Sequence, residues 1–256
     1  MNQSAFRQIV YQQGRLGYRP MPWRDQPTLY YVLVSELMLQ QTQVARVLPK
    51  FTSFVATFPD VQTLAAAELQ DVLTAWQGLG YNRRAKYLHQ AVRLIAEGAP
   101  VATLADLVKL PGVGTNTAGA ILNYVYQIPT PFVETNIRTV YFNHFFRQDD
   151  TVSDRQVLKL VDQTIDRTQP RQWFWALMDY GARLKADGKA RLAMSRQYRT
   201  HTPFQGSVRQ IRGEILRYQA RGWSRAQIVA VLSSDPRFAS AIESLQRDGL
   251  LYNDNA

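Results

Sequence analysis

The 256-residue sequence contains no cysteine and only three histidines. Without cysteine the chain has no disulfide, no thiolate ligand for zinc or an iron–sulfur cluster, and no cysteine nucleophile; three histidines leave few other metal ligands. Long apolar runs are also missing: none approaches the roughly 18 residues of a membrane span, and the opening MNQSAFRQIV does not form a secretory signal. We therefore expect a cytoplasmic protein with no membrane contact.

Positive charge is what the chain has in excess. The 30 lysines and arginines oppose 20 acidic residues, which gives a net charge of +10 and an isoelectric point near 9.9. Eleven basic but only two acidic residues lie between Arg183 and Arg225, a local net charge of +9. Such a run is either a solvated face or a surface for a polyanion. Because this one holds nearly all of the net charge, we favour nucleic acid as the partner.

Hydrophobic residues recur at helical spacing through most of the chain, whereas the alternation typical of strands is scarce. Proline and glycine divide the sequence into about ten or more short helices, so the predicted fold is all-α. Helices are expected to begin near Asp60, Thr103 and 152–154, where Thr or Asp can cap free amides. The last part of the chain predicts a small winged-helix-like module, made of helices near 207–220, 225–233 and 237–247 and a turn into a short strand at 248–252.

The segment LPGVGTNTA at 110–118 is the most specific local motif, and it lies between two helical patterns. Gly112 and Gly114 permit a tight turn that lies close to a ligand. The free amides that open the following helix suit a phosphate group. The alternative is an ordinary turn between two helices.

Two glutamates and an aromatic turn are further candidates. Glu36 lies in an apolar helical run, where partial burial would raise its pKa and make it a general acid; otherwise it is a helix-edge residue that reaches solvent. Glu134 opens a helix and either faces a developing cation or complements the helix dipole. Two carboxylates in unlike environments are what cleavage of a glycosidic bond uses. Tyr81 lies in the segment WQGLGYNRRA at 76–85. Its ring either inserts as a wedge between stacked bases, while the arginines behind it bind phosphates, or packs in the core.

In their order and spacing, these motifs resemble the helix-hairpin-helix DNA glycosylases, most closely the A/G-specific adenine glycosylases. The resemblance runs from Pro22 to about Ala182 and is near-identical over 35–44 and 110–122. It implies two α-helical lobes with a DNA-binding cleft, to which Glu36 and Glu134 come from opposite lobes. The expected parts are a lobe of residues 28–130 that includes the hairpin, a second lobe of residues 1–27 and 131–200, and the module of residues 206–256.

The resemblance also implies roles for individual residues. Glu36 is the implied acid that protonates N7 of a flipped adenine, and Glu134 is the implied stabilising carboxylate. Asn136 and Tyr126 would line the reaction centre and complete the catalytic set. The expected DNA contacts, including the wedge beside the 8-oxoguanine, are Arg24, Gln40, Gln41, Thr42, Tyr81, Arg83, Gly112, Val113, Gly114, Asn116 and Thr117. A monovalent cation often accompanies such a hairpin, and no other cofactor is expected.

The reaction that the resemblance implies is hydrolysis of adenine mispaired with 8-oxoguanine or guanine. Asn116 stands where relatives with lyase activity carry a Schiff-base lysine, so a monofunctional glycosylase is expected. Its partner would be double-stranded DNA with a mismatch or an oxidative lesion, and the protein would act as a monomer in the cytoplasm, on the bacterial nucleoid. The alternatives are a glycosylase of the same fold for another mismatched or damaged base, and a non-catalytic protein that binds DNA lesions.

Three features depart from the family's pattern. Glu134 stands in place of an aspartate, and we expect the site to compensate for the longer side chain because Glu36, Asn136 and Tyr126 are present. The residues after 205 resemble the short tail of some bacterial adenine glycosylases rather than the long domain with which many relatives read 8-oxoguanine. The four cluster cysteines of relatives are replaced here by Lys185, Leu192, Ser195 and His201. We expect that segment to pack without metal and to contact the DNA backbone.

Overall fold

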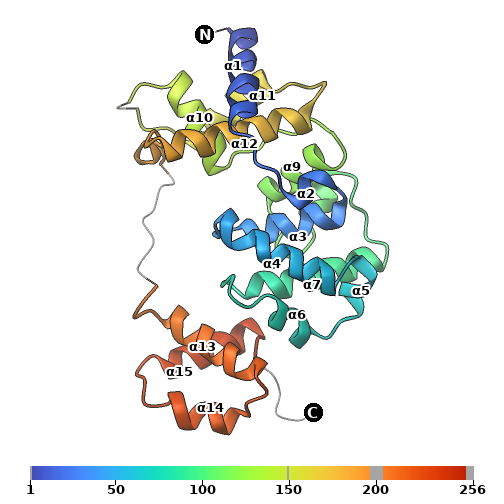
Figure 1. Ribbon diagram of the computed structural model, residues 1–256, viewed down its shortest axis with the longest axis vertical. Helices are drawn as coiled ribbons and strands as arrows, with labels where there is room; N and C mark the ends of the chain where they lie inside the picture. The colour runs from blue at the N-terminus through green and yellow to red at the C-terminus, as the bar shows by residue number, and fades with distance from the viewer. Residues whose placement is uncertain (1, 149, 197–203, 252–256) are drawn as a thin grey trace. The chain divides into compact units, whose positions relative to one another are not determined.

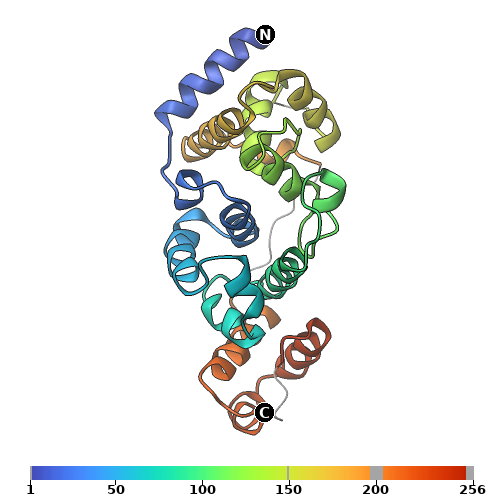
Figure 2. The ribbon, with the colours of Figure 1, turned by 90° about the vertical axis from the view of Figure 1, so that its right-hand side faces the viewer.

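The computed structural model describes residues 2–148, 150–196 and 204–251, and helices make up most of this part of the chain (Figure 1, Figure 2). No β-strand occurs in those ranges, where the one extended pairing is an isolated bridge between Val152 and Ser195. The predicted all-α fold is confirmed. No helix of the described ranges is long and apolar enough to span a membrane.

The chain divides into two compact units. The first comprises residues 1–36, 100–109 and 113–200, and the second comprises residues 37–99, 110–112 and 201–256. These units group the chain differently from the expected lobes, because residues 28–36 and most of 100–130 belong with 131–200. Glu36 is the last residue of the first segment of the first unit, which also holds Glu134, and the expected lobes stay a prediction.

The first unit holds the helices that carry both glutamates. Its elements are α1 (Gln3–Leu16), α2 (Pro22–Asp25), most of α3 (Leu29–Leu39), α8 (Leu104–Leu107), α9 (Thr115–Tyr124), α10 (Thr135–Phe145), α11 (Asp154–Thr164), α12 (Pro170–Ala186) and the short 3-10 turn η1 (Leu192–Met194). Helix α12 packs against α10 on one side and α1 on another. The ring of Phe6 on α1 contacts Tyr141 and Trp173 at centroid distances of 5.2 and 5.9 Å. This aromatic cluster makes α10 and α12 a firm base for the residues at the start of α10.

The second unit contains the C-terminal end of α3 and the remaining helices. These are α4 (Val44–Thr57), α5 (Val61–Ala66), α6 (Leu69–Ala75), α7 (Arg83–Ala96), α13 (Val208–Ala220), α14 (Arg225–Leu232) and α15 (Phe238–Asp248). The Phe54 ring packs against Phe58 and Trp76 at 5.1 and 6.0 Å in its core. Helix α13 contacts α14 and α15, which are drawn from orange to red in Figure 1, and it also contacts α6. The C-terminal helices are therefore packed on the rest of this unit.

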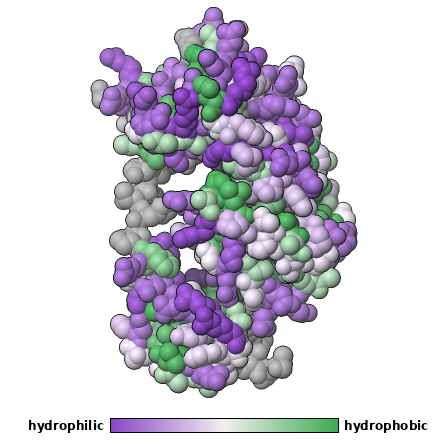
Figure 3. Space-filling model, in the orientation of Figure 1, coloured by the Kyte–Doolittle hydropathy of each residue, from purple (hydrophilic) through white to green (hydrophobic). Residues whose placement is uncertain are grey.

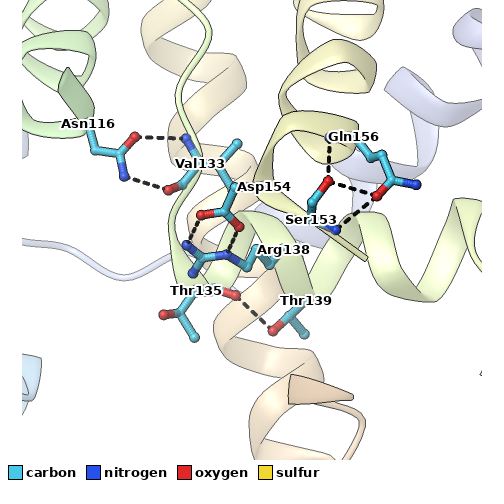
Figure 4. Close-up of polar contacts among 8 residues, drawn as sticks. All are labelled: Asn116, Val133, Thr135, Arg138, Thr139, Ser153, Asp154 and Gln156. Atoms are coloured by element: carbon cyan, nitrogen blue, oxygen red, sulfur yellow. Dashed lines mark hydrogen bonds and ion pairs between the residues drawn. The ribbon is translucent and has the colours of Figure 1, made fainter. Parts of the chain in front are cut away.

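Helices begin where a polar side chain precedes an apolar run. Asp60 caps α5 and Thr103 caps α8, as predicted. At the third predicted start, Ser153 caps α11 through a reciprocal set of hydrogen bonds with Gln156 (Figure 4). Asp154, the capping residue expected there, is instead the first residue of the helix.

The C-terminal helices match the predicted ranges to within one residue at each end. The strand predicted after them does not form in the described residues. Gly249 ends α15 in the left-handed conformation, and Leu250 donates its N–H to the carbonyl of Leu245 at 3.0 Å. That hydrogen bond closes the helix end and leaves the Leu250 amide unable to pair with a strand. Tyr252, at the end of the predicted strand, lies outside the described residues.

Candidate active site

Glu36 lies on α3 between the fully buried residues Ser35 and Leu37, and its own side chain is half-buried. Burial raises the pKa of Glu36 well above its ordinary value, and the nearby charge of Glu134 raises it further. Both effects favour the protonated form. The apolar surroundings predicted this direction, and it suits a general acid.

Glu134 is the residue from which α10 starts, yet its side chain caps no helix amide. Burial raises the pKa of Glu134, whereas the charge of Arg138 lowers it. Arg138 is held by a two-pronged ion pair with Asp154, at 2.6 and 2.7 Å (Figure 4). Burial thus raises the pKa of both glutamates, and Arg138 offsets part of that rise at Glu134. Two carboxyl groups in unlike environments suit a division into proton donor and charge stabiliser.

Helix α9 holds the extended segment that leads to Glu134 by two asparagine side chains. Asn116 donates to the Val133 carbonyl at 2.8 Å and accepts from the Val133 N–H at 3.3 Å (Figure 4). Asn123 makes the same two bonds with Thr130, at 2.7 and 3.3 Å. The two asparagines are seven residues apart and so share one helix face. We call these paired bonds the amide clamps; they fix the backbone just before the glutamate.

Gly119, between the two asparagines, permits this close approach because a Cβ there would lie 2.9 Å from the Cβ of Phe132. The amide of Asn116 is therefore used within the protein. Asn116 is nevertheless exposed, and its expected contact with DNA stays a prediction.

Asn136 follows in the first turn of α10, where α10 meets α12. A Cβ at Gly181 of α12 would lie 2.2 Å from the Asn136 carbonyl oxygen, so only glycine fits at this crossing. In the described part of the chain the buried Oδ1 of Asn136 has no hydrogen-bond partner. An unpaired buried acceptor this close to Glu134 suits a hydrogen-bond donor from a substrate.

Tyr124, two residues before the expected Tyr126, is a tyrosine whose pKa responds to the charges of both glutamates. Tyr124 is only 7% exposed, and its ring contacts Phe132 and Trp175 at 6.2 and 6.1 Å. Burial raises the pKa of Tyr124, and the charges of Glu36 and Glu134 raise it further. Tyr126 lies beyond the end of α9 and is 37% exposed, and burial alone raises its pKa.

Arg24 was expected to contact DNA, but the structure places it in a buried ion pair. Its Nη1 lies 2.7 Å from a carboxylate oxygen of Asp179, and both side chains are almost fully buried. The guanidinium also stacks on Tyr18 and Trp175, 5.7 and 5.4 Å from their ring centroids. Arg24 therefore joins α2 to α12 and has no free face for a phosphate.

The polar residues after α3 surround a second buried arginine, Arg84. Arg84 donates to the carbonyls of Leu37, Met38 and Gln40 at 2.7, 2.7 and 2.6 Å, and burial lowers its pKa to about 10. The interpretation of this arginine as a phosphate ligand was wrong, because it caps the C-terminal end of α3. Thr42, an expected DNA contact, accepts a hydrogen bond from Arg84 at 3.0 Å.

Other expected DNA contacts of the second unit are at its surface. Gln41 is exposed and has a left-handed backbone, with φ 57°. Tyr81 is 45% exposed, so the core-tyrosine alternative is wrong. Arg83 is exposed as well, and its nearest acidic partner is Asp248 at 3.4 Å. These side chains remain accessible to a ligand.

The hairpin motif makes the turn that its glycines predicted. Gly112 has φ 77°, and its carbonyl accepts a hydrogen bond from the Gln40 amide at 3.2 Å. Gly114 is exposed and begins α9 without a side-chain cap. The start of α9 thus offers backbone amides of the kind that bind an anion. Val113 and Thr117 are buried, so their side chains are not available to a ligand.

The positions of the cluster cysteines do not fit an iron–sulfur cluster in this chain. Lys185 lies in the last turn of α12, Leu192 and Ser195 lie in and after η1, and His201 lies outside the described residues. None of these side chains offers a thiolate. Val152 instead holds the segment by two backbone hydrogen bonds, to Met194 at 2.7 Å and from Arg196 at 3.0 Å. The described residues contain no group of three or more acidic or histidine side chains that could bind a metal.

The fold and this site define a class of protein, a helical protein of DNA base excision. The family model of HhH-GPD superfamily base excision DNA repair proteins matches residues 34–166. That range is more than half of the chain and includes both glutamates and the hairpin. The chain belongs to this superfamily.

Within the superfamily the similar curated proteins are adenine DNA glycosylases. The one from Mycolicibacterium smegmatis is 34% identical over 258 residues, which cover 91% of this chain and 88% of that protein. Those from two strains of Buchnera aphidicola are 39% and 32% identical over 50% and 65% of this chain. The matches cover only 38% and 48% of these two relatives, so the chain aligns with less than half of their length.

Solved structures show the same fold at low sequence identity. A thermostable thymine-DNA glycosylase has a TM-score of 0.61 and is 18% identical, with 70% of this chain and 86% of that chain covered. A trapped complex of endonuclease III with DNA has a TM-score of 0.57 and is 17% identical, with 72% and 86% covered. At these identities the likeness concerns the fold alone.

Proposed function

We propose that this protein is a monofunctional DNA N-glycosylase that removes adenine mispaired with 8-oxoguanine or guanine. The observation that carries the proposal is the burial of two interacting carboxyl groups, Glu36 and Glu134, in unlike charge environments, because Arg138 acts on Glu134. The names of the similar curated proteins support adenine as the base. The mispaired partner is inferred from the family resemblance of the motifs.

The reaction follows from the two unlike carboxyl groups. A base must leave the duplex to be reached, and a mispaired adenine costs less free energy to extrude than a paired one. Glu36 donates its proton to N7 of the adenine, and the bond between the base and C1′ breaks with its electron pair going to the base. The Glu134 carboxylate stabilises the positive charge that develops on the sugar. Water then adds to C1′, its second proton returns to Glu36, and an abasic site remains.

Asn116 bears on the type of glycosylase. An amide nitrogen is not a nucleophile, and the Asn116 amide is already paired with Val133. No Schiff base with the sugar would form at this position. The proposed product is therefore an intact strand with an abasic site rather than a cleaved strand.

Duplex DNA with a mismatch or an oxidative lesion is the proposed partner, bound by a monomer. The backbone amides that open α9 would bind phosphate, and a monovalent cation at the 110–114 turn remains part of the proposal. Gln41 and Tyr81 are exposed and would lie beside the opposite base. Hydrophilic side chains cover much of the face that Figure 3 shows, and the net charge of +10 suits a polyanionic partner. A bacterial nucleoid is the proposed location.

Single-turnover release of the base tests the proposal. Duplexes with adenine opposite 8-oxoguanine, guanine or thymine, and with thymine or uracil opposite guanine, are incubated with excess protein and then treated with alkali to cut abasic strands. Wild type should release adenine from the first two, and Glu36→Gln and Glu134→Gln should lose most of the rate. Glu243→Gln, which removes an exposed carboxylate on α15, is the matched control and should keep the rate.

Three results would contradict the proposal. Equal rates for wild type and both active-site variants would remove the glutamates from the chemistry. Release of thymine or uracil alone would favour the same fold acting on another base. Tight lesion binding without release of any base, unchanged by Glu36→Gln, would favour a non-catalytic binding protein.

A further inference from the structure

Tyr81 stands on a turn whose backbone is held in an uncommon conformation. Its φ is 47°, a left-handed value that residues with a side chain seldom adopt. Arg84 donates to the carbonyls of Leu79 and Gly80 at 3.3 and 2.9 Å, and the Trp76 indole donates to Gly80 at 3.3 Å. Because left-handed backbone persists only when its surroundings enforce it, this turn is rigid. A rigid turn thus presents a ring that is 45% exposed.

The hydroxyl of Tyr81 is contacted by a residue 128 positions further along the chain. Arg209, in the first turn of α13, donates from Nη1 to the Tyr81 hydroxyl oxygen at 3.2 Å. The guanidinium of Arg84 lies 5.5 Å from the centroid of the same ring. The Tyr81 ring is therefore restrained at its backbone end by Arg84 and at its hydroxyl end by Arg209.

Asp248, at the end of α15, anchors the C-terminal helices to the same part of the unit. Its carboxylate pairs with Arg212 of α13 at 2.6 Å and with Arg83 of α7 at 3.4 Å. Its backbone carbonyl accepts a hydrogen bond from Lys86 at 2.8 Å. The Asp248 side chain is only 10% exposed, so salt screens these pairs less than surface pairs. Arg83 and Lys86 lie in the first turn of α7, which directly follows the Tyr81 turn.

We propose that helices α13–α15 help this protein to distinguish the base opposite the excised adenine, because Arg209 holds Tyr81 in position. The inference rests on the proposed function. An aromatic ring inserted next to a base can distinguish two similar bases only if the ring itself is held in place, since a mobile ring adapts to both. Arg209 is a positioning residue in this scheme. The ligand that Tyr81 would contact is an oxidised or unoxidised purine opposite adenine in duplex DNA.

Equilibrium affinities of paired duplexes test this role without depending on catalysis. Each duplex carries a 2′-fluoro adenine nucleoside that resists hydrolysis, opposite either 8-oxoguanine or guanine, and binding is followed by fluorescence anisotropy. Arg209→Gln should lower the ratio of the two affinities by about 3- to 10-fold, the worth of one hydrogen bond. Arg217→Gln removes one positive charge from the same helix and is the matched control. It should weaken binding to both duplexes alike and leave the ratio unchanged.

A double-mutant cycle separates an effect through Tyr81 from a separate DNA contact of Arg209. Tyr81→Phe should lower the affinity ratio as Arg209→Gln does, and the double variant should lower it no further. The inference is overturned if Arg209→Gln and Arg217→Gln change the ratio equally. It is also overturned if Arg209→Gln acts as strongly in the Tyr81→Phe background as in wild type. Failure of the proposed function would show separately, as wild-type protein that releases no adenine from a cleavable duplex.

Discussion

The crossing of α10 and α12 gives a prediction whose size follows from the geometry. In Gly181→Ala the new methyl group would lie 2.2 Å from the carbonyl oxygen of Asn136 and 2.8 Å from its Cα. Ordinary contacts of a Cβ begin at 3.4 Å, so the first turn of α10 must move away by about 1.2 Å. Glu134 stands at the start of that turn and has to move with it. A displacement of about 1 Å in an active site costs on the order of 100-fold in rate.

We therefore expect Gly181→Ala to slow single-turnover adenine release by on the order of 100-fold. The overpacked crossing should also lower the free energy of unfolding by about 1–3 kcal/mol, measured by urea denaturation. Gly213→Ala on α13 is the matched control, because a Cβ there meets nothing within 4 Å. Alanine at that helical position should stabilise the protein by about 0.5–1 kcal/mol and leave the rate unchanged.

The rate and the stability of Gly181→Ala are read separately. Unchanged adenine release in a protein that is folded at the assay temperature would refute the reasoning, because the start of α10 would then not set the rate. A rate that falls only as far as the folded fraction falls would refute it as well.

Three further predictions concern tyrosine, ion-pair and pH effects. Tyr124→Phe should slow single-turnover adenine release by about tenfold, since it removes a hydroxyl near both carboxylates, whereas Tyr126→Phe should leave the rate unchanged; equal effects would contradict the placement of Tyr124. Asp179→Asn should cost about 3–5 kcal/mol in urea denaturation, because it leaves the Arg24 charge buried and unpaired, and an unaffected midpoint would contradict the buried pair. The folded protein binds the Glu36 proton more tightly than the unfolded chain does, so wild-type stability falls as pH rises from 4.5 through the raised pKa. At pH 8, Glu36→Gln should therefore be more stable than wild type, by about 1.4 kcal/mol in free energy of unfolding for each pH unit between the folded and unfolded pKa values of Glu36. Near pH 4.5 it should show no such advantage. Calorimetry at both pH values would contradict this prediction if the two proteins unfolded at the same temperature throughout.

Helix positions could be predicted from the sequence because they depend on neighbouring residues. Asp60 and Thr103 cap the amides that directly follow them, and the apolar spacing of the C-terminal helices is local. The sequence could not exclude a strand after residue 248. Leu250 has a side chain that suits a strand, and only the structure shows that its N–H bonds the Leu245 carbonyl at the end of α15 instead.

At the site, the sequence could not predict contacts between residues that are far apart along the chain. Asp179, the partner of Arg24, lies 155 residues away, so the burial of Arg24 cannot be inferred from its sequence neighbours. The helical spacing gives a signal for Tyr124, which lies eight residues after Asn116 on α9. Tyr126 lies past the end of that helix, so the period of α9 favours Tyr124.

The amide clamp at Asn116 limits how a chain of this kind can acquire strand-cleaving chemistry. A lysine at 116 would supply the amine with which lyase-type relatives attack the sugar. The same substitution would release Val133, the residue immediately before Glu134, from both of its hydrogen bonds to α9. A single position thus serves either as a nucleophile or as a support for the carboxylate. An evolutionary path to a bifunctional enzyme would first require a second support for the Val133 backbone.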